Sequence, residues 1–173
     1  SMARQRLFML SSINLGSAWW GMDIGGFHSG TPSAENYYRW IQFGAFVPVF
    51  RVHGEFNQER EPWNYGALAE QIATKYIRMR YELIPYINNA AWENHLNGTP
   101  LVKPFVMVYP DDPLSRQYYD GFFFGNDIIV YPVVVESALQ KQIYIPEGTW
   151  IDYFNGKKYY GPANYNYLLS NHD

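Results

Sequence analysis

The sequence has 173 residues, of which 47% are hydrophobic and 17% are charged, so it can form a packed core and is unlike a disordered chain. Its net charge is −3 without any basic tract, which argues against nucleic acid as a partner. It contains no cysteine, which excludes disulfides and thiolate metal sites, and no apolar run long enough to cross a bilayer. We therefore expect neither a nucleic-acid partner nor a membrane partner.

The first part of the chain alternates short apolar runs with helical patterns. We expect a buried strand over residues 13–20, a helix over 35–43 behind a Ser33 cap, and a second buried strand over 45–52. A long helix should follow from an Asn64 cap and be interrupted at Pro85. Strands buried on both faces that alternate with helices predict part of a parallel sheet or barrel.

The pattern changes near residue 100, after which short strands and turns dominate. The expected strands are residues 101–109, 122–124, 128–135, 142–145, 151–154 and 157–160. A turn is expected over 146–149, and Asn155-Gly156 is a strong hairpin signal. The fold class is thus α/β followed by all-β, with an antiparallel sandwich in the second part. We expect two domains, residues 1–99 and residues 100–173.

Two segments at the ends of the expected buried strands carry candidate site residues. In the first, the glycine pair 25–26 lets the backbone turn tightly and presents Asp23 and Phe27 to a ligand. In the second, alternation along a strand places Arg51 and His53 on one face. Loops at the same ends of parallel strands converge, so these side chains are candidates for one polar pocket.

Each of these residues also has a simpler interpretation. An aspartate before two glycines is usually a turn residue, and a lone histidine is usually a structural hydrogen-bonding group. His28 and His53 with Asp23 could in principle ligate zinc, but no diagnostic spacing is present, so we expect no metal. The charged run 59–61 before Pro62 and Trp63 is interpreted as a solvated loop with local ion pairs, which forms a lip of the pocket and orders the loop after His53.

Aromatic residues make up 19% of the sequence, including 16 tyrosines and 6 tryptophans. Such rings combine a flat apolar face with a polar edge, which matches the C–H faces and hydroxyls of sugars. The same rings could instead fill a β-rich core. Composition by itself leaves both interpretations open.

The motifs, taken together and in order, resemble glycoside hydrolase family 31, which contains α-glucosidases, α-xylosidases and transglucosylases. The similarity extends over nearly the whole chain from about Ile13. The motifs that carry it are Asp23-Ile24-Gly25-Gly26-Phe27, Arg39-Trp40, Phe50-Arg51-Val52-His53, Arg60-Glu61-Pro62-Trp63, Arg80-Tyr81-Glu82-Leu83-Ile84-Pro85-Tyr86, Lys103-Pro104 with Tyr109-Pro110-Asp111-Asp112, Gly125-Asn126-Asp127-Ile128-Ile129-Val130-Tyr131-Pro132-Val133 and Ile145-Pro146-Glu147-Gly148-Thr149-Trp150.

This resemblance implies the C-terminal part of a (β/α)8 barrel followed by a β-sandwich. It implies that His53 hydrogen-bonds sugar hydroxyls, that Phe27 lines the subsite and that Asp23 helps organise it. Arg51 and Trp63 are expected to pack behind these three residues and keep their side chains in position. The implied partner is an oligosaccharide or α-glycoside with α-linked glucose or xylose, and no cofactor is expected.

The sequence departs from the family pattern in its acidic residues. Retaining glycosidases need two carboxyl groups about 5–5.5 Å apart, and in the family both are aspartates upstream of the part that matches Ile13 to Phe27. Residues 1–12 contain neither Asp nor Glu. We therefore expect part of a longer enzyme, inactive alone, whose open sheet edges and apolar faces meet the missing barrel segments or another copy. The competing hypotheses are a non-catalytic carbohydrate-binding module in the β-rich half and a structural β-rich module.

Overall fold

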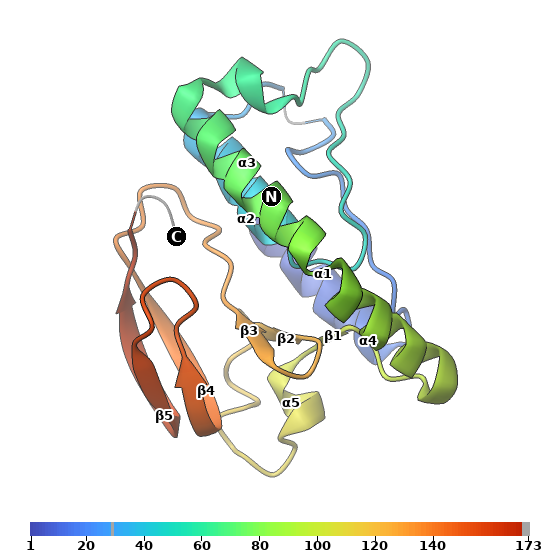
Figure 1. Cartoon of the computed structure of the whole chain (residues 1–173), viewed down its shortest axis with the longest axis vertical. Helices are drawn as coiled ribbons and strands as arrows, with labels where there is room; N and C mark the ends of the chain where they lie inside the picture. The colour runs from blue at the N-terminus through green and yellow to red at the C-terminus, as the bar shows by residue number, and fades with distance from the viewer. Residues whose placement is uncertain (29, 171–173) are drawn as a thin grey trace.

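The computed structural model describes residues 1–28 and 30–170. The helices are α1 (Met2–Asn14), α2 (Ala34–Gly44), the 3-10 helix η1 (Pro62–Tyr65), α3 (Ala67–Glu82), α4 (Ile84–Asn97) and the short α5 (Phe105–Val108). The strands are β1 (Val102–Lys103), β2 (Phe122–Phe124), β3 (Ile128–Val130), β4 (Gln140–Ile151) and β5 (Lys158–Leu168). Figure 1 shows α3 and α4 forming one long arm, with the β4–β5 hairpin to its side.

Two of the expected helix boundaries follow local chemistry. The side chain of Ser33 accepts a hydrogen bond from the Asn36 amide at 3.0 Å, so α2 has the predicted cap. Pro85 lies in the first turn of α4, where its missing N–H costs no helical hydrogen bond, and the two long helices break at Leu83 as predicted. The Asn64 cap was wrong: residues 62–65 form η1, and Gly66 precedes α3.

The expected buried strands of the first part are much shorter than predicted. Ile13 belongs to α1, whose buried residues Met2, Arg6, Met9, Leu10 and Ile13 recur at helical spacing. Between the segments after α1 and after α2, the β pairing of the described residues is limited to two isolated parallel bridges, Gly21 with Val49 and Ile24 with Val52. The parallel pairing expected of a barrel is therefore present, although without continuous strands.

The second part is antiparallel, as predicted, but its strands have different limits. β1, β2 and β3 form one sheet in that order, and β4 pairs with β5 in a second sheet. The expected strand over 101–109 turns into α5 after Lys103, and the expected turn over 146–149 is instead a bulge within β4. The hairpin at Asn155-Gly156 is confirmed, and it joins β4 to β5.

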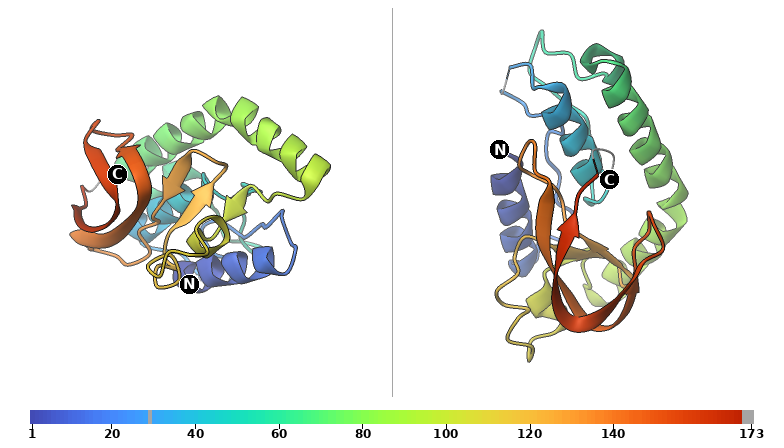
Figure 2. Two further views of the ribbon diagram at one scale, coloured as in Figure 1. Left: turned by 90° about the horizontal axis from the view of Figure 1, so that it is seen from below. Right: turned by 90° about the vertical axis from the view of Figure 1, so that its left-hand side faces the viewer.

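One hydrophobic core joins the two parts of the chain. Figure 2 shows the small sheet between α1 on one side and α3 and α4 on the other. Alternate side chains of β2 point in opposite directions: Phe122 and Phe124 enter the large core with the helices, whereas Phe123 packs with Phe105 and Tyr144. The sheet is thereby fixed to the helices by buried rings. No helix in the described ranges is long and apolar enough to span a bilayer.

Tyr86 of α4 ties the β2–β3 turn to the helical arm. Its hydroxyl accepts hydrogen bonds from the amides of Asn126 at 2.8 Å and Asp127 at 3.0 Å, and it donates to the Phe124 carbonyl at 3.1 Å. Burial raises the pKa of this phenol. The turn that follows β2 thus receives a cap from a residue about 40 positions earlier.

Replacing Tyr86 by Phe should lower the free energy of unfolding by about 1 kcal/mol, because the two turn amides lose their acceptor. Tyr81→Phe is the matched control, since Tyr81 is exposed on the neighbouring turn of helix and should change stability by less than about 0.5 kcal/mol. Urea unfolding followed by circular dichroism measures both. Equal effects of the two variants would contradict the assigned role.

Candidate functional site

The two segments with predicted site residues lie side by side and are joined through their backbones. The Ile24 amide donates to the Arg51 carbonyl at 3.1 Å, and the His53 amide donates to the Ile24 carbonyl at 3.2 Å. Farther along, the Glu55 amide donates to the Phe27 carbonyl at 3.3 Å. This ladder places the polar side chains of both segments at the same end of the paired backbone.

Asp23 and Arg51 form an ion pair across this ladder, between Oδ1 of the carboxylate and Nη2 of the guanidinium. Asp23 is half-buried and Arg51 is exposed. An ion pair of this exposure contributes little to stability, about 0–1 kcal/mol. Its effect is geometric, because it orients the carboxylate at the end of the first segment.

Phe27 and His53 lie face to face beside this ion pair. Their ring centroids are 5.3 Å apart and the ring planes are inclined by 25°. The Phe27 ring is half-buried while His53 is exposed, so the imidazole lies on the solvent side of the stack. The structure therefore brings Asp23, Phe27, Arg51 and His53 into one cluster, which we call the Phe27–His53 cluster.

An outer contact links the same two loops. His28 Nδ1 lies 2.8 Å from Glu55 Oε2, and the other oxygen of Glu55 accepts from Gln58 Nε2 at 3.1 Å. The His28 ring also meets the edge of Phe27 with centroids 4.5 Å apart. These polar groups continue the cluster outward from the stacked rings.

Trp63 is the predicted site residue that the structure leaves apart. It lies in η1 with 65% of its surface exposed, and it makes no hydrogen bond or ring contact with the described residues. Its supporting role stays a prediction. Within residues 1–28 and 30–170, no three His, Asp or Glu side chains gather closely enough to hold a metal ion.

Sequence reasoning missed Arg60, and the interpretation of 59–61 as a solvated loop was wrong for this residue. Arg60 is only 5% exposed. Its guanidinium donates to the carbonyls of Gly26 and Gly30, both at 2.8 Å through Nη2, and so contacts the loop that carries Phe27. This contact also explains the glycine at position 25, where a Cβ would lie 2.7 Å from the Arg60 side chain.

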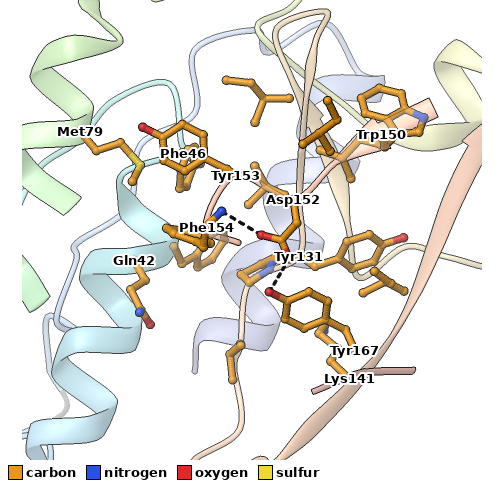
Figure 3. Close-up of a pocket in the computed structure, with 18 of the residues that line it drawn as sticks. Gln42, Phe46, Met79, Tyr131, Lys141, Trp150, Asp152, Tyr153, Phe154 and Tyr167 are labelled. Carbon is orange, nitrogen blue, oxygen red and sulfur yellow. Dashed lines mark hydrogen bonds between the residues drawn. The ribbon is translucent and has the colours of Figure 1, made fainter. Parts of the chain in front are cut away.

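A hollow lies elsewhere, between the helices α2 and α3 and the strands β3, β4 and β5 (Figure 3). It has a volume of about 440 Å³ and none of the predicted site residues line it. Two of its polar groups have partners within the chain, whereas the buried Nε2 of Gln42 has none among the described residues. Asp152 accepts from Tyr167 at 2.8 Å and from Asn155 at 2.9 Å, and Lys141 pairs with Asp120 at 2.8 Å. This hollow is an apolar seam, distinct from the Phe27–His53 cluster.

Family models match both parts of the chain. The model of the glycosyl hydrolases family 31 TIM-barrel domain matches residues 1–90, and the model of the family's C-terminal domain matches residues 98–172. Among curated relatives, a 1,6-alpha-glucosyltransferase of Sporosarcina globispora is 42% identical over 98% of this chain and 14% of its own length. An alpha-xylosidase of Saccharolobus solfataricus is 36% identical over 84% of this chain and 20% of its own length.

Solved structures of enzymes from the same family also superpose on the chain. The dextranase of Flavobacterium johnsoniae in complex with isomaltotriose superposes with a TM-score of 0.92 at 35% identity, covering 99% of this chain and 22% of that one. An alpha-xylosidase from a soil metagenome in complex with xylose superposes with a TM-score of 0.89 at 29% identity, covering 96% of this chain and 28% of that one. The chain therefore spans less than a third of each of these relatives.

Gly25→Ala tests the close approach of Arg60 to the Phe27 loop. Gly25 and Gly16 both have positive φ, +96° and +90°. A Cβ added at Gly25 would meet the Arg60 side chain, whereas a Cβ added at Gly16 would meet no atom within 4 Å. Gly16→Ala should cost about 1–2 kcal/mol from backbone strain alone. Gly25→Ala should cost at least about 1 kcal/mol more, because the added methyl overlaps the Arg60 stem. Thermal and urea unfolding of both variants measure the difference, and equal costs would rule out the contact.

Proposed function

The chain belongs to glycosyl hydrolase family 31, and we propose that it forms one side of the sugar pocket of a retaining α-glycosidase. Its relatives include α-glucosidases, α-xylosidases and glucosyltransferases. The proposed substrate is an α-linked glucoside or xyloside. The barrel part is proposed to end near residue 99, with a β-rich domain from residue 100.

The observation that carries this proposal is the stack of Phe27 and His53 beside the Asp23–Arg51 ion pair. The half-buried Phe27 ring supplies an apolar contact at the side of the pocket. The exposed His53 imidazole hydrogen-bonds hydroxyls of the pyranose. Asp23, oriented by Arg51, organises the inner end of the subsite. Solved relatives with isomaltotriose and xylose support a saccharide as the ligand.

The bond-breaking groups are proposed to lie on other segments of a longer protein. A retaining mechanism needs a nucleophile and an acid/base about 5–5.5 Å apart, which form and then hydrolyse a covalent glycosyl-enzyme. Asp23 is engaged by Arg51, and one carboxylate cannot fill both roles. That the chain covers only 14–20% of its first three curated relatives leaves room for the missing pair.

The barrel part of the chain presents apolar side chains that further segments could cover. Leu15 and Trp19, which precede the first paired segment in the chain, and Val49, which lies in one of the parallel bridges, are exposed. We propose that other barrel segments pack on them in the longer protein and that the isolated chain self-associates through them. A monodisperse monomer in light scattering would count against this part of the proposal.

The 173-residue chain should show no turnover of chromogenic α-glucosides or α-xylosides beyond the background of an identically purified blank. The reason is that the carboxylate pair is proposed to lie outside it. Release of nitrophenol followed by absorbance measures this. Turnover that copurifies with the chain through successive purification steps would contradict the proposal, because it would show that the chain carries its own catalytic groups.

Replacing His53 by Ala should weaken binding of xylose or isomaltose about tenfold or more, because the sugar hydroxyls lose a hydrogen-bonding partner. His95→Ala is the matched control, since His95 is exposed on α4 beside Trp92 and should leave affinity unchanged. Saturation-transfer NMR titrations measure both. The rival β-rich sugar module predicts equal affinity in wild type and His53→Ala, and full affinity in a piece made of residues 100–173.

A further inference from the structure

We propose that Arg60 is a positioning residue that holds the turn carrying Phe27, and thereby fixes the stack of Phe27 on His53. The part that concerns sugar affinity rests on the function proposed above. The part that concerns the loop rests only on the contacts of Arg60. The buried guanidinium of Arg60 lies between the glycine-rich turn and the segment that follows His53.

The Arg60 guanidinium donates hydrogen bonds to backbone carbonyls of the turn. Nε and Nη2 both donate to the Gly26 carbonyl, at 3.2 and 2.8 Å, and Nη2 also donates to the Gly30 carbonyl at 2.8 Å. One carbonyl directly precedes Phe27 and the other follows it by three positions. A planar fork can bind two backbone carbonyls in this way, whereas an ammonium group presents a single point charge.

The other edge of the same guanidinium holds the loop after His53. Nη1 donates to the Glu59 carbonyl at 2.9 Å and to the Tyr65 hydroxyl at 3.2 Å, and Nη2 reaches Gln58 Oε1 at 2.6 Å. All these acceptors, like those on the turn, are uncharged. No ion pair joins this guanidinium to a carboxylate of the described residues, so it depends on these dipoles, and removing one side of the arrangement is costly.

Arg60 itself is anchored to the helical scaffold. The Tyr37 hydroxyl of α2 donates to the Arg60 carbonyl at 2.6 Å, and the Tyr37 ring stacks on Tyr65 with centroids 3.8 Å apart. Burial raises the pKa of Tyr37, so its hydroxyl stays a donor at physiological pH. A continuous series of contacts thus runs from α2 through Arg60 to the turn.

The turn needs this support because of its own sequence. Gly25, Gly26 and Gly30 all have positive φ, at +96°, +84° and +64°. Glycine permits these angles but loses more conformational freedom than other residues when it is fixed. Without Arg60 the turn would sample many conformations, and the Phe27 ring would leave His53 for part of the time. A ring that is already in place reduces the entropic cost of binding a rigid pyranose.

Arg80 supplies a matched control. It also donates to three backbone carbonyls, those of Ala45, Val47 and Pro48, at 2.7–2.9 Å. Burial lowers its pKa to about 10. Arg80→Lys therefore makes the same chemical change at an arginine with a comparable set of hydrogen bonds. The carbonyls that Arg80 binds, however, belong to residues 45–48 and not to the turn of Phe27.

The experiment compares Arg60→Lys with Arg80→Lys in the whole chain by hydrogen exchange and by NMR of the His53 ring. Arg60→Lys should speed exchange in peptides covering residues 22–28 about tenfold or more, and shift the His53 ring protons, which lie in the ring current of Phe27. Arg80→Lys should speed exchange over residues 45–48 and leave the His53 signals in place. Unchanged exchange and ring signals in Arg60→Lys would overturn the proposal, as would equal shifts in both variants.

Tyr65→Phe keeps the test decisive if Arg60→Lys does not fold. The substitution removes the Tyr65 hydroxyl, which accepts a hydrogen bond from Arg60 Nη1 and donates one to the Glu59 carbonyl at 2.8 Å. It should give a smaller acceleration in the same peptides, and no acceleration there would refute the proposal. A xylose titration of each folded variant then separates the two ideas. Absence of binding by the wild type defeats the proposed function, whereas the exchange data decide the role of Arg60 independently.

Discussion

Backbone pairing between residues 20–24 and 49–53 determines where the site residues lie. Three hydrogen bonds make this contact, from Val49 to Trp20, from Ile24 to Arg51 and from His53 to Ile24. Ile24 is fully buried and faces Gly44 of α2, so the register is fixed by packing as well as by hydrogen bonds. A slip of one residue would turn Asp23 and Arg51 toward the core. The placement of the Phe27–His53 cluster depends on this register.

Backbone pairing leaves the conformation of the loops beyond the ladder undetermined, and two arginine side chains supply the missing constraint. Arg60 binds the turn after Ile24, and Arg80 binds the segment before Val49. Both satisfy carbonyls that have no partner in regular secondary structure, which would otherwise be costly when buried. Arg60 thus holds a loop that carries the cluster, whereas Arg80 holds the segment that enters the pairing at its other end.

Sequence patterns predicted the features that depend on local stereochemistry. The Ser33 cap, the break near Pro85 and the Asn155-Gly156 hairpin were all predicted, since each follows from a few neighbouring residues. Residues 105–108 and 146–149 were mispredicted because tertiary packing decides them: Phe105 is drawn into a helix facing Tyr144, and β4 continues through a bulge because β5 pairs with it. Arg60 was missed because its partners are distant backbone carbonyls, which no spacing reveals.

The aromatic content bears on which half of the chain meets a sugar. In the second half most rings are used in packing: Phe122 and Phe124 enter the large core, and Tyr131 exchanges two hydrogen bonds with the backbone of Tyr144 at 2.8 Å. Tyr159 likewise packs against Tyr165 and Tyr167. Rings buried in this way present no face to a ligand. The exposed His53 on a half-buried Phe27 does present one, which favours the first half as the place of recognition.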